Sequence, residues 1–331
     1  MLIFWLIVFI ISLAILVKGA DWLIESGEKF GLALGLSPFI VGVTIVSIGT
    51  SFPELVSSFA AMLRGVNEVV VANAVGSNIA NILLVVGISA VVGRSLIVQK
   101  SLIDLDLPLL AICTVLFLGM AWDGIITLGE SILLVVTYAV YVLYTVVHKD
   151  EDNPRQIFQR LRARFRFATS LVADAKTAIQ RPRLKLLDFA KLVGGVFGLV
   201  LGAKYLIDSL IVLSEILNIG TGAIAITAVA FGTSLPELLV SAKAAWQGKS
   251  EVALGNIFGS NVFNLLVVVG FPGLFRQLPL DAQTMSIGLP IMAAATFLFV
   301  ISGISRRIHI WEGSLYLSIY ILFLAKLFNW F

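Results

Sequence analysis

Apolar residues in this chain come in long runs with short polar breaks between them. Each run is long enough to cross a bilayer as a helix, which takes roughly 20 mainly apolar residues. Continuous runs, rather than short alternating segments, favour helices over a β-barrel. The pattern therefore predicts an all-α membrane protein with ten transmembrane helices, at 1–17, 36–63, 68–93, 102–121, 125–147, 188–213, 219–246, 251–271, 284–304 and 310–330.

One stretch, 148–187, interrupts this pattern and divides the runs into two sets of five. It holds ten of the chain's 23 Lys and Arg residues, so the positive-inside rule places it in the cytoplasm. Five spans on each side then put both termini outside the cell membrane, and the two halves insert in opposite orientations. We expect a first repeat at 1–147, a basic cytoplasmic loop and a second repeat at 188–331, which are inverted five-helix repeats of the kind found in transporters.

Composition supports lipid as the main solvent of this protein. Hydrophobic residues make up 59% of the chain and charged residues 13%, against a usual value of about 25%. Cys113 is the only cysteine, which excludes an internal disulfide and a thiolate metal site. The two histidines, His148 and His309, fall at predicted helix ends, so no nucleophile–histidine pair of an enzyme can be built. Beyond its positive charge, nothing in the chain indicates a nucleic-acid partner.

Two polar blocks recur in the two halves at one fixed offset. GTSFPE at 49–54 returns as GTSLPE at 232–237, and GSNIAN at 76–81 returns as GSNVFN at 259–264. Each second copy lies 183 positions after the first, so the spacing between the blocks is also kept. A duplicated polar block with a carboxylate, set in apolar sequence, is typical of an ion site inside a membrane. The blocks fall in the longer segments 36–93 and 219–271.

Each block carries one glutamate, Glu54 or Glu237, about midway along its apolar run. A carboxylate at the centre of a membrane helix costs about 2.5–3.5 kcal/mol even on the lenient insertion scale. No basic residue lies near Glu54 in its run, and Lys243 is nearly two turns beyond Glu237. The repeat symmetry is expected to bring both carboxylates together at the midplane, where they repel each other and a divalent cation would satisfy both.

Other oxygen-bearing groups accompany the glutamates. Pro53 and Pro236 each remove a backbone donor and free carbonyls one turn earlier, which predicts broken helices at the midplane. Side-chain hydroxyls and amides recur in both copies, at Thr50, Ser51, Ser77, Asn81, Thr233, Ser234, Ser260 and Asn264. Oxygen ligands without sulfur or imidazole suit Na⁺ and Ca²⁺ rather than zinc or copper, while Mg²⁺ gives up its waters reluctantly. The two asparagines could equally bind neighbouring helices together.

These blocks resemble the two repeats of the sodium/calcium exchanger branch of the calcium/cation antiporter superfamily, in its minimal prokaryotic type. The resemblance covers the ten runs, the central loop and both motif pairs. It implies a secondary antiporter that exchanges sodium for calcium by alternating access at a midplane site, with no cofactor. The spans 1–17 and 188–213 would slide together against the rest of the bundle.

The resemblance also implies roles for individual residues. Glu54 and Glu237 would bind calcium, aided by Thr50 and Thr233. Sodium and calcium would compete for these glutamates, which makes their exchange obligatory. The further sodium positions would be Ser51, Ser77, Ser234 and Ser260, with backbone oxygens near Ser47 and Ala230 and with Asn81 and Asn264 completing the middle of the site.

One position departs from part of the family. Some relatives, including potassium-dependent ones, carry Asp where this chain has Asn264, which leaves two acidic residues in the site and predicts potassium independence. A calcium/proton antiporter of the same fold is the nearest alternative. Similar proton-coupled relatives tend to have Asn before the glutamate, so the hydroxyls found there favour sodium. A cation channel is a more distant alternative, because two deep carboxylates would hold an ion rather than pass it.

Overall fold

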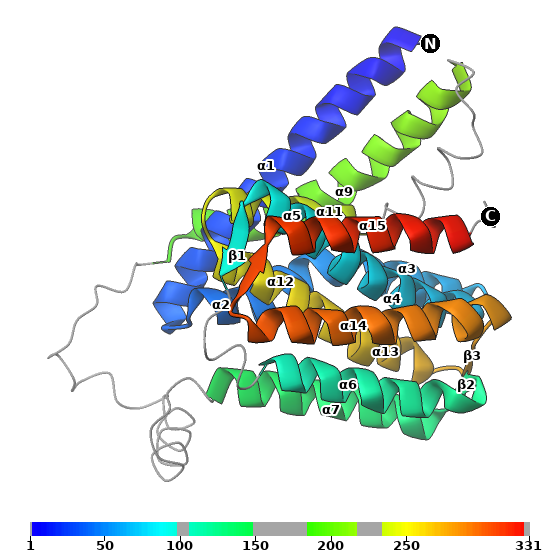
Figure 1. Cartoon of the computed structure of the whole chain (residues 1–331). Helices are drawn as coiled ribbons and strands as arrows, with labels where there is room; N and C mark the ends of the chain where they lie inside the picture. Colours follow the sequence, from blue (N-terminus) through cyan, green and yellow to red (C-terminus); the bar gives the residue numbers. More distant parts are fainter. Residues whose placement is uncertain (1, 98–105, 148–183, 217–233, 328–331) are drawn as a thin grey trace, which may run out of the picture.

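The computed structural model describes residues 2–97, 106–147, 184–216 and 234–327. Helices dominate both halves, and η marks their π- or 3₁₀-helical segments (Figure 1). The first half holds α1 (Leu2–Leu34), α2 (Pro38–Val41), η1 (Gly42–Val46), α3 (Ser47–Leu63), α4 (Glu68–Ile79), η2 (Ala80–Val86), α5 (Gly87–Val92), β1 (Ser95–Ile97), α6 (Leu107–Met120), η4 (Ala121–Asp123), β2 (Ile125–Ile126) and α7 (Leu128–Val147). The second half holds α9 (Leu186–Ile216), α11 (Leu235–Trp246), α12 (Ser250–Phe263), η5 (Asn264–Val268), α13 (Gly270–Gly273), β3 (Leu278–Pro279), η6 (Thr284–Gly288), α14 (Leu289–Ile304), β4 (Arg307–His309) and α15 (Ile310–Leu327).

Two short antiparallel strand pairs join the halves. In β1–β4, Ser95 lies opposite His309, and in β2–β3, Ile126 lies opposite Leu278. Leu278 comes 183 positions after Ser95, and His309 comes 183 positions after Ile126, so one offset relates both the motifs and the strand registers. The two pairs lie at opposite ends of the bundle (Figure 1). Strands that correspond through this offset therefore lie at opposite ends of the bundle.

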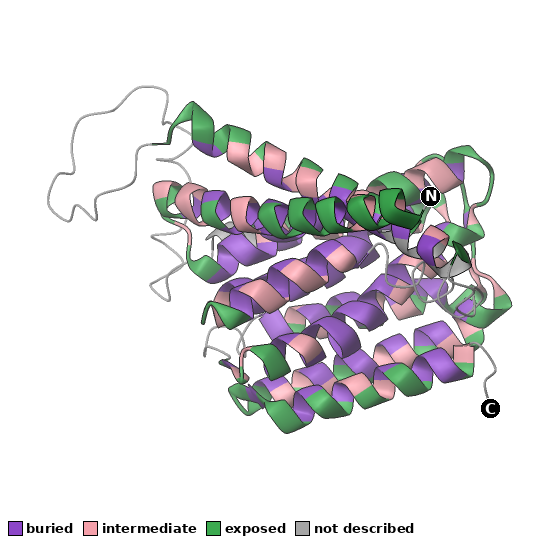
Figure 2. Cartoon of the chain, turned by 90° about the horizontal axis from the view of Figure 1, so that it is seen from above, coloured by how far each residue is buried: buried purple, intermediate pink, exposed green. Residues whose placement is uncertain are grey.

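The helices that carry the polar blocks form the core. The apolar window within Ser250–Gly273 is 94% buried and that within Glu68–Val92 is 78% buried, whereas the window within Leu2–Leu34 is only 17% buried. Figure 2 shows the same contrast, with buried residues concentrated in the central helices. The bundle thus places its polar motifs where the surrounding protein, not lipid, is their environment.

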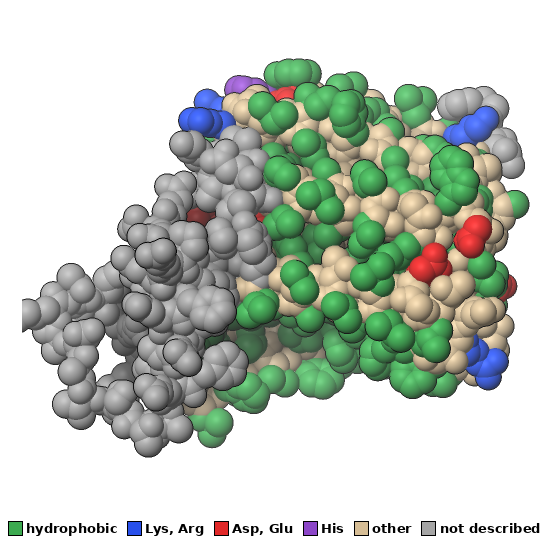
Figure 3. Space-filling view, turned by 90° about the horizontal axis from the view of Figure 1, so that it is seen from below, with side chains coloured by type: hydrophobic (Ala, Val, Ile, Leu, Met, Phe, Trp, Pro, Cys, Tyr) green, Lys and Arg blue, Asp and Glu red, His purple; other side chains and the backbone are tan. Residues whose placement is uncertain are grey.

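One face of the bundle is largely apolar. Figure 3 shows hydrophobic side chains spread over one face, with charged side chains mainly toward its two ends. Within the described residues, seven helices are long and apolar enough to cross a membrane, and two shorter apolar helices lie at Leu107–Asp123 and Leu128–Leu143. The prediction of a helical, multi-pass membrane protein is confirmed, while the number of spans stays a prediction.

Helices α1 and α9 pack closely against each other through glycines. A Cβ atom at Gly19 would lie 2.9 Å from the carbonyl oxygen of Gly195, and one at Gly202 would lie 2.8 Å from the backbone nitrogen of Leu16. Such small residues let the backbones of two membrane helices approach each other. The two helices run side by side and project together from the bundle (Figure 1).

Two expectations about individual helices, the end of the first helix and a break at Pro53, are wrong. The predicted span 1–17 stops at Lys18, but α1 continues to Leu34. The charged residues that end the apolar signal are compatible with helix, and Glu25 pairs with Lys29 one turn later at 3.1 Å. The helix is also not broken at Pro53, because α3 runs through it without interruption. The irregular backbone instead takes the form of the π-helical segments η1, η2 and η5.

Candidate ion-binding site

Both predicted glutamates are fully buried in the interior of the bundle. Glu54 lies on α3 and Glu237 in the first turn of α11, and each is 0% exposed. Ser51, on α3 close to Glu54, donates a hydrogen bond of 2.8 Å to Oε1 of Glu237. The structure thus brings the two copies of the first block together, although they are far apart in the sequence.

The carboxylates of these glutamates lack protein partners. Both oxygens of Glu54 and Oε2 of Glu237 make no hydrogen bond within the described part of the chain. The ion pairs found among the described residues include neither glutamate. A buried ionised carboxylate without a partner is strongly unfavourable, and a second one nearby adds repulsion. These oxygens are therefore available to a cation or a proton.

Thr50 connects the first block to α12. Its hydroxyl lies 3.0 Å from Oδ1 of Asn256, to which it donates, and 3.4 Å from the hydroxyl of Ser260. All three residues are fully buried. The motifs single out Thr50 and Ser260, but sequence reasoning missed Asn256, which lies just before the repeated GSN block.

A second signal could have found Asn256. Counting back 183 positions gives Asn73, so this asparagine also recurs in both halves. In the structure, Nδ2 of Asn256 donates to Ser241 at 2.9 Å and Nδ2 of Asn73 donates to Ser58 at 3.0 Å. The two serines are likewise 183 positions apart. Both pairs lie outside the contiguous motif matches, which is why the motifs did not reveal them.

The second block supplies further buried polar groups. Ser77 lies near the end of α4, Asn81 lies in η2, and Asn264 begins η5. The side-chain amides of both asparagines and the hydroxyl of Ser234 have no hydrogen-bond partner among the described residues. π-Helical turns often mark functional sites in membrane and soluble proteins, because they rearrange the backbone locally. Like the two carboxylates, these groups therefore offer buried oxygen atoms without a hydrogen-bond partner among the described residues.

Close helix packing sets Ser47 against α12. Its hydroxyl donates to the carbonyl oxygen of Val43 one turn earlier. A Cβ atom at Gly259 would lie 2.3 Å from that carbonyl and 2.6 Å from the Cβ of Ser47, so only glycine fits there. The other two predicted site residues, Thr233 and Ala230, lie outside the described residues.

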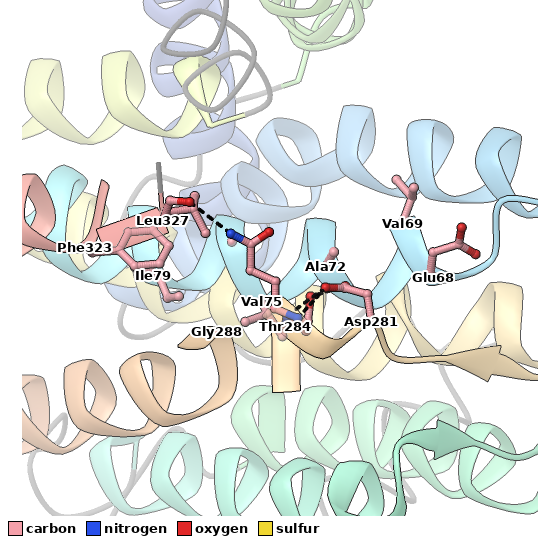
Figure 4. A pocket seen from close by; sticks show the side chains of 12 residues that line it. Glu68, Val69, Ala72, Val75, Ile79, Asp281, Thr284, Gly288, Phe323 and Leu327 are labelled. Carbon is pink, nitrogen blue, oxygen red and sulfur yellow. Dashed lines mark hydrogen bonds between the residues drawn. The ribbon is translucent and has the colours of Figure 1, made fainter. Parts of the chain in front are cut away.

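A cavity of about 380 Å³ lies elsewhere, between α4, η6 and α15 (Figure 4). Its carboxylates come from Glu68 and Asp281. Asp281 accepts hydrogen bonds from the backbone N–H groups of Gln283 and Thr284 and from the Thr284 hydroxyl, so it caps the following helical segment. Burial raises the pKa of Asp281, but these hydrogen bonds outweigh burial and hold the pKa below its ordinary value. None of the predicted site residues that the structure describes lines this cavity.

Comparison with known proteins decides the family. The model of the sodium/calcium exchanger protein family matches residues 4–147 and 188–329, which is most of the chain on both sides of the basic loop. The chain belongs to this family. That finding confirms the resemblance read from the repeated motifs.

Relatives of this exchanger match it along nearly its whole length. It is 32% identical to the sodium/calcium exchanger MaX1 of Methanosarcina acetivorans, over 97% of this chain and 98% of MaX1. It is 30% identical to the membrane protein MJ0091 of Methanocaldococcus jannaschii, over 96% of each chain. The solved structure of the sodium–calcium exchanger NCX_Mj, soaked with zero Na⁺ and Ca²⁺, aligns with a TM-score of 0.80 at 28% identity, covering 99% of this chain and 100% of that one.

The exchanger is therefore a membrane antiporter that exchanges sodium for calcium, and it is not an enzyme. The transported ions are its substrates, and no cofactor takes part. The family model does not match residues 148–187, so the basic loop lies outside the part of the chain that defines the family.

Proposed function

We propose that Glu54 and Glu237 together bind the transported calcium ion, with Thr50 and Thr233 as further ligands. The observation that carries this proposal is the set of buried carboxylate oxygens without a protein partner. One Ca²⁺ supplies the two positive charges that two carboxylates need. Its preference for six to eight oxygen ligands also fits the hydroxyls and amides of the two polar blocks.

Sodium competes for the same carboxylates in this proposal. A carboxylate pair filled by sodium cannot also hold calcium, so each ion displaces the other. An empty site leaves two buried charges uncompensated, which opposes the return of an unloaded transporter and couples the two ion fluxes. The further sodium ligands are Ser51, Ser77, Ser234, Ser260, Asn81, Asn264 and the backbone oxygens near Ser47 and Ala230.

We further propose ten transmembrane helices in two inverted repeats, 1–147 and 188–331. The strand pairs related by the 183-residue offset support this, because they lie at opposite ends of the bundle. The basic loop 148–187 lies in the cytoplasm, and both termini lie outside. Most of the other Lys and Arg residues agree with this orientation, since Arg94 and Arg307 fall at the inner ends, whereas Arg64 and Arg276 fall at the outer ends.

Alternating access requires one part of the bundle to move against the rest, and we assign this motion to α1 and α9. Besides their glycine contacts, ion pairs of 3.0 Å join Lys29 to Asp188 and Glu25 to Lys191, so the two helices form one unit. Partly exposed ion pairs are weak individually, so the ion pairs between this unit and the core can break and form again during the motion. Those contacts include the pairs Asp21–Lys243 and Glu28–Lys249, each 2.7 Å long.

Potassium has no assigned place in this site. Asn264 carries no charge and is fully buried, so the site holds two carboxylates and its charge is balanced by one Ca²⁺ or by sodium. We therefore expect exchange to proceed at the same rate with and without potassium.

Calcium uptake into proteoliposomes tests the proposed site. Vesicles loaded with sodium are diluted into sodium-free buffer containing radioactive calcium, and we expect uptake that requires internal sodium and ignores an imposed pH gradient. Glu54→Gln should abolish this uptake, whereas Glu68→Gln, which changes an exposed carboxylate on α4, should leave it intact. Uptake that follows the pH gradient and not sodium would indicate proton coupling, and normal uptake in Glu54→Gln would refute the site.

A further inference from the structure

A buried chain of hydrogen bonds runs from Ser241 through Asn256 to Thr50. Nδ2 of Asn256 donates to the Ser241 hydroxyl at 2.9 Å, and the Thr50 hydroxyl donates to Oδ1 of Asn256 at 3.0 Å. All three residues are 0% exposed. The chain links α11 to α12 and then crosses to α3 in the other half of the protein. It ends beside the proposed calcium site, one turn before Glu54.

The same arrangement begins in the other half. Asn73 on α4 donates to Ser58 on α3 at 3.0 Å, and these residues correspond to Asn256 and Ser241 through the 183-residue offset. The counterpart of Thr50 is Thr233, which lies outside the described residues. The asparagine–serine pair is thus a repeated feature of the fold beyond the two contiguous motifs.

The chemistry of a threonine ligand explains what this chain can do. A hydroxyl binds a cation only through its oxygen lone pairs, so its proton has to point away from the ion. Oδ1 of Asn256 takes that proton at a distance shorter than the 3.2 Å to the carbonyl oxygen of Ser47. With the amide turned over, an N–H group would instead donate to Thr50 and occupy a lone pair. In this orientation the Ser241 hydroxyl accepts from Nδ2 of Asn256, so the nitrogen side of the amide also has a partner.

We propose that Asn256 is a positioning residue, which holds the Thr50 oxygen toward the transported calcium ion, and that Ser241 holds Asn256. This inference rests on the proposed function, in which Thr50 is a calcium ligand. Asn256 acts through Thr50, so its contribution disappears when the Thr50 hydroxyl is absent.

A double-mutant cycle tests this dependence, because it measures coupling between two residues directly. Sodium-dependent calcium uptake is measured over a range of calcium concentrations for Thr50→Val, Asn256→Leu and the double variant. Each single change should raise the half-saturating calcium concentration about three- to tenfold, which is the range expected for losing one hydrogen bond, while the maximal rate changes little. The double variant should be no worse than Thr50→Val. Ser241→Ala should act in the same direction and likewise add nothing to Thr50→Val.

Thr114→Val provides the matched control. Thr114 is also a buried helical threonine, but its hydroxyl donates only to the Leu110 carbonyl of its own helix, at 2.9 Å. Its effect should simply add to that of Asn256→Leu. Additive effects of Thr50→Val and Asn256→Leu, or a loss of maximal rate without a change in calcium dependence, would overturn the inference. If Asn256→Leu does not fold, Ser241→Ala with Thr50→Val decides the same question.

The proposed site fails by a different result, so the two can be told apart. Unchanged sodium-dependent uptake in Glu54→Gln refutes the site itself. An additive cycle in protein that is active and depends on Glu54 refutes only the positioning role of Asn256.

Discussion

At the scale of one residue, the proposal of an ion site depends most on Glu54. The side chain is completely buried, both of its oxygens lack partners in the described chain, and the Glu237 carboxylate shares the same interior. A protein that needed this residue only for packing would gain stability by replacing it with an apolar residue. In the proposed site, a bound cation would instead compensate the two carboxylates.

This view predicts how calcium changes stability. Calcium binds the folded state, so it should raise the melting temperature of the purified exchanger in sodium-free buffer. At a hundredfold excess of calcium over Kd, the free energy of unfolding should increase by about 2.7 kcal/mol. Glu54→Gln should remove most of that increase, because an amide contributes no charge to the cation. In calcium-free and sodium-free buffer the variant should be at least as stable as the wild type, since one of two repelling charges is gone. Thermal unfolding followed by tryptophan fluorescence measures both effects.

Glu68→Gln again serves as the control for that measurement. It removes a carboxylate at the exposed start of α4 and should keep the full response to calcium. A calcium response of normal size in Glu54→Gln would mean that the ion binds elsewhere.

The repeated motifs could be recognised in the sequence, but the residues that hydrogen-bond to them could not. A polar block repeated at a fixed offset locates Glu54 and Glu237, and the meeting of Ser51 with Glu237 follows from that repetition. Asn256 was missed because it lies outside the contiguous motif matches, and its recurrence as Asn73 does not show its contact with Thr50. Hydrogen bonds between helices depend on how the helices pack, which a short motif does not record.

At the scale of elements, glycines decide how near the site helices approach one another. A Cβ atom at Gly255 would lie 2.4 Å from the carbonyl oxygen of Phe39, and one at Gly42 would lie 2.7 Å from that of Val252. With Gly259, these residues let α12 lie directly on α2 and η1. The packing keeps Ser47 and the start of α3 within reach of the second polar block.

Gly259→Ala is therefore expected to disrupt the site as well as the packing. The new methyl group meets the Val43 backbone, which cannot move as a flexible side chain could, so α12 and η1 must separate. Overpacking of this kind costs about 1–3 kcal/mol of stability, and the displacement of Ser47 should lower sodium-dependent calcium uptake severalfold or more. Melting temperature and vesicle uptake are measured on the same preparation.

Gly119→Ala is the matched control for that change. Gly119 lies on an exposed face of α6, where an added methyl group meets no described atom within 4 Å. It should leave both stability and uptake near the wild-type values. A tolerated Gly259→Ala would show that the contact between α12 and η1 is looser than the structure has it.

Helix boundaries were harder to predict than helix existence, for two physical reasons. Hydropathy follows lipid exposure, so the charged second half of α1 reads as a loop although its Glu25–Lys29 pair supports a helix. Proline removes only one backbone bond, and α3 remains helical on both sides of Pro53. The π-helical turns depend on packing around Asn81 and Asn264, and no sequence signal distinguishes them from regular helix.

For the whole molecule, the proposed inverted repeats would allow the transporter to open toward either side of the membrane. The β1–β4 pair and the β2–β3 pair have equivalent registers and cap opposite ends of one bundle. In the proposed inverted repeats, each half contributes the same polar block with its direction reversed. The proposed site would then face similar surroundings on its two sides, so the motion proposed for α1 and α9 could expose it to either.

Accessibility of the two ends tests this orientation. With buried Cys113 replaced by Ser, single cysteines are introduced as Asp123→Cys beside β2 and His309→Cys in β4, both exposed positions. A thiol reagent that cannot cross membranes should label Asp123→Cys in intact cells, because the β2–β3 end faces outward if loop 148–187 is cytoplasmic. It should label His309→Cys only after the membrane is opened. Labelling of both positions from outside would contradict the prediction that the two ends lie on opposite sides of the membrane. The reverse pattern would keep the inverted repeats but reverse the orientation of the whole protein, so that the basic loop would lie outside, against the positive-inside rule.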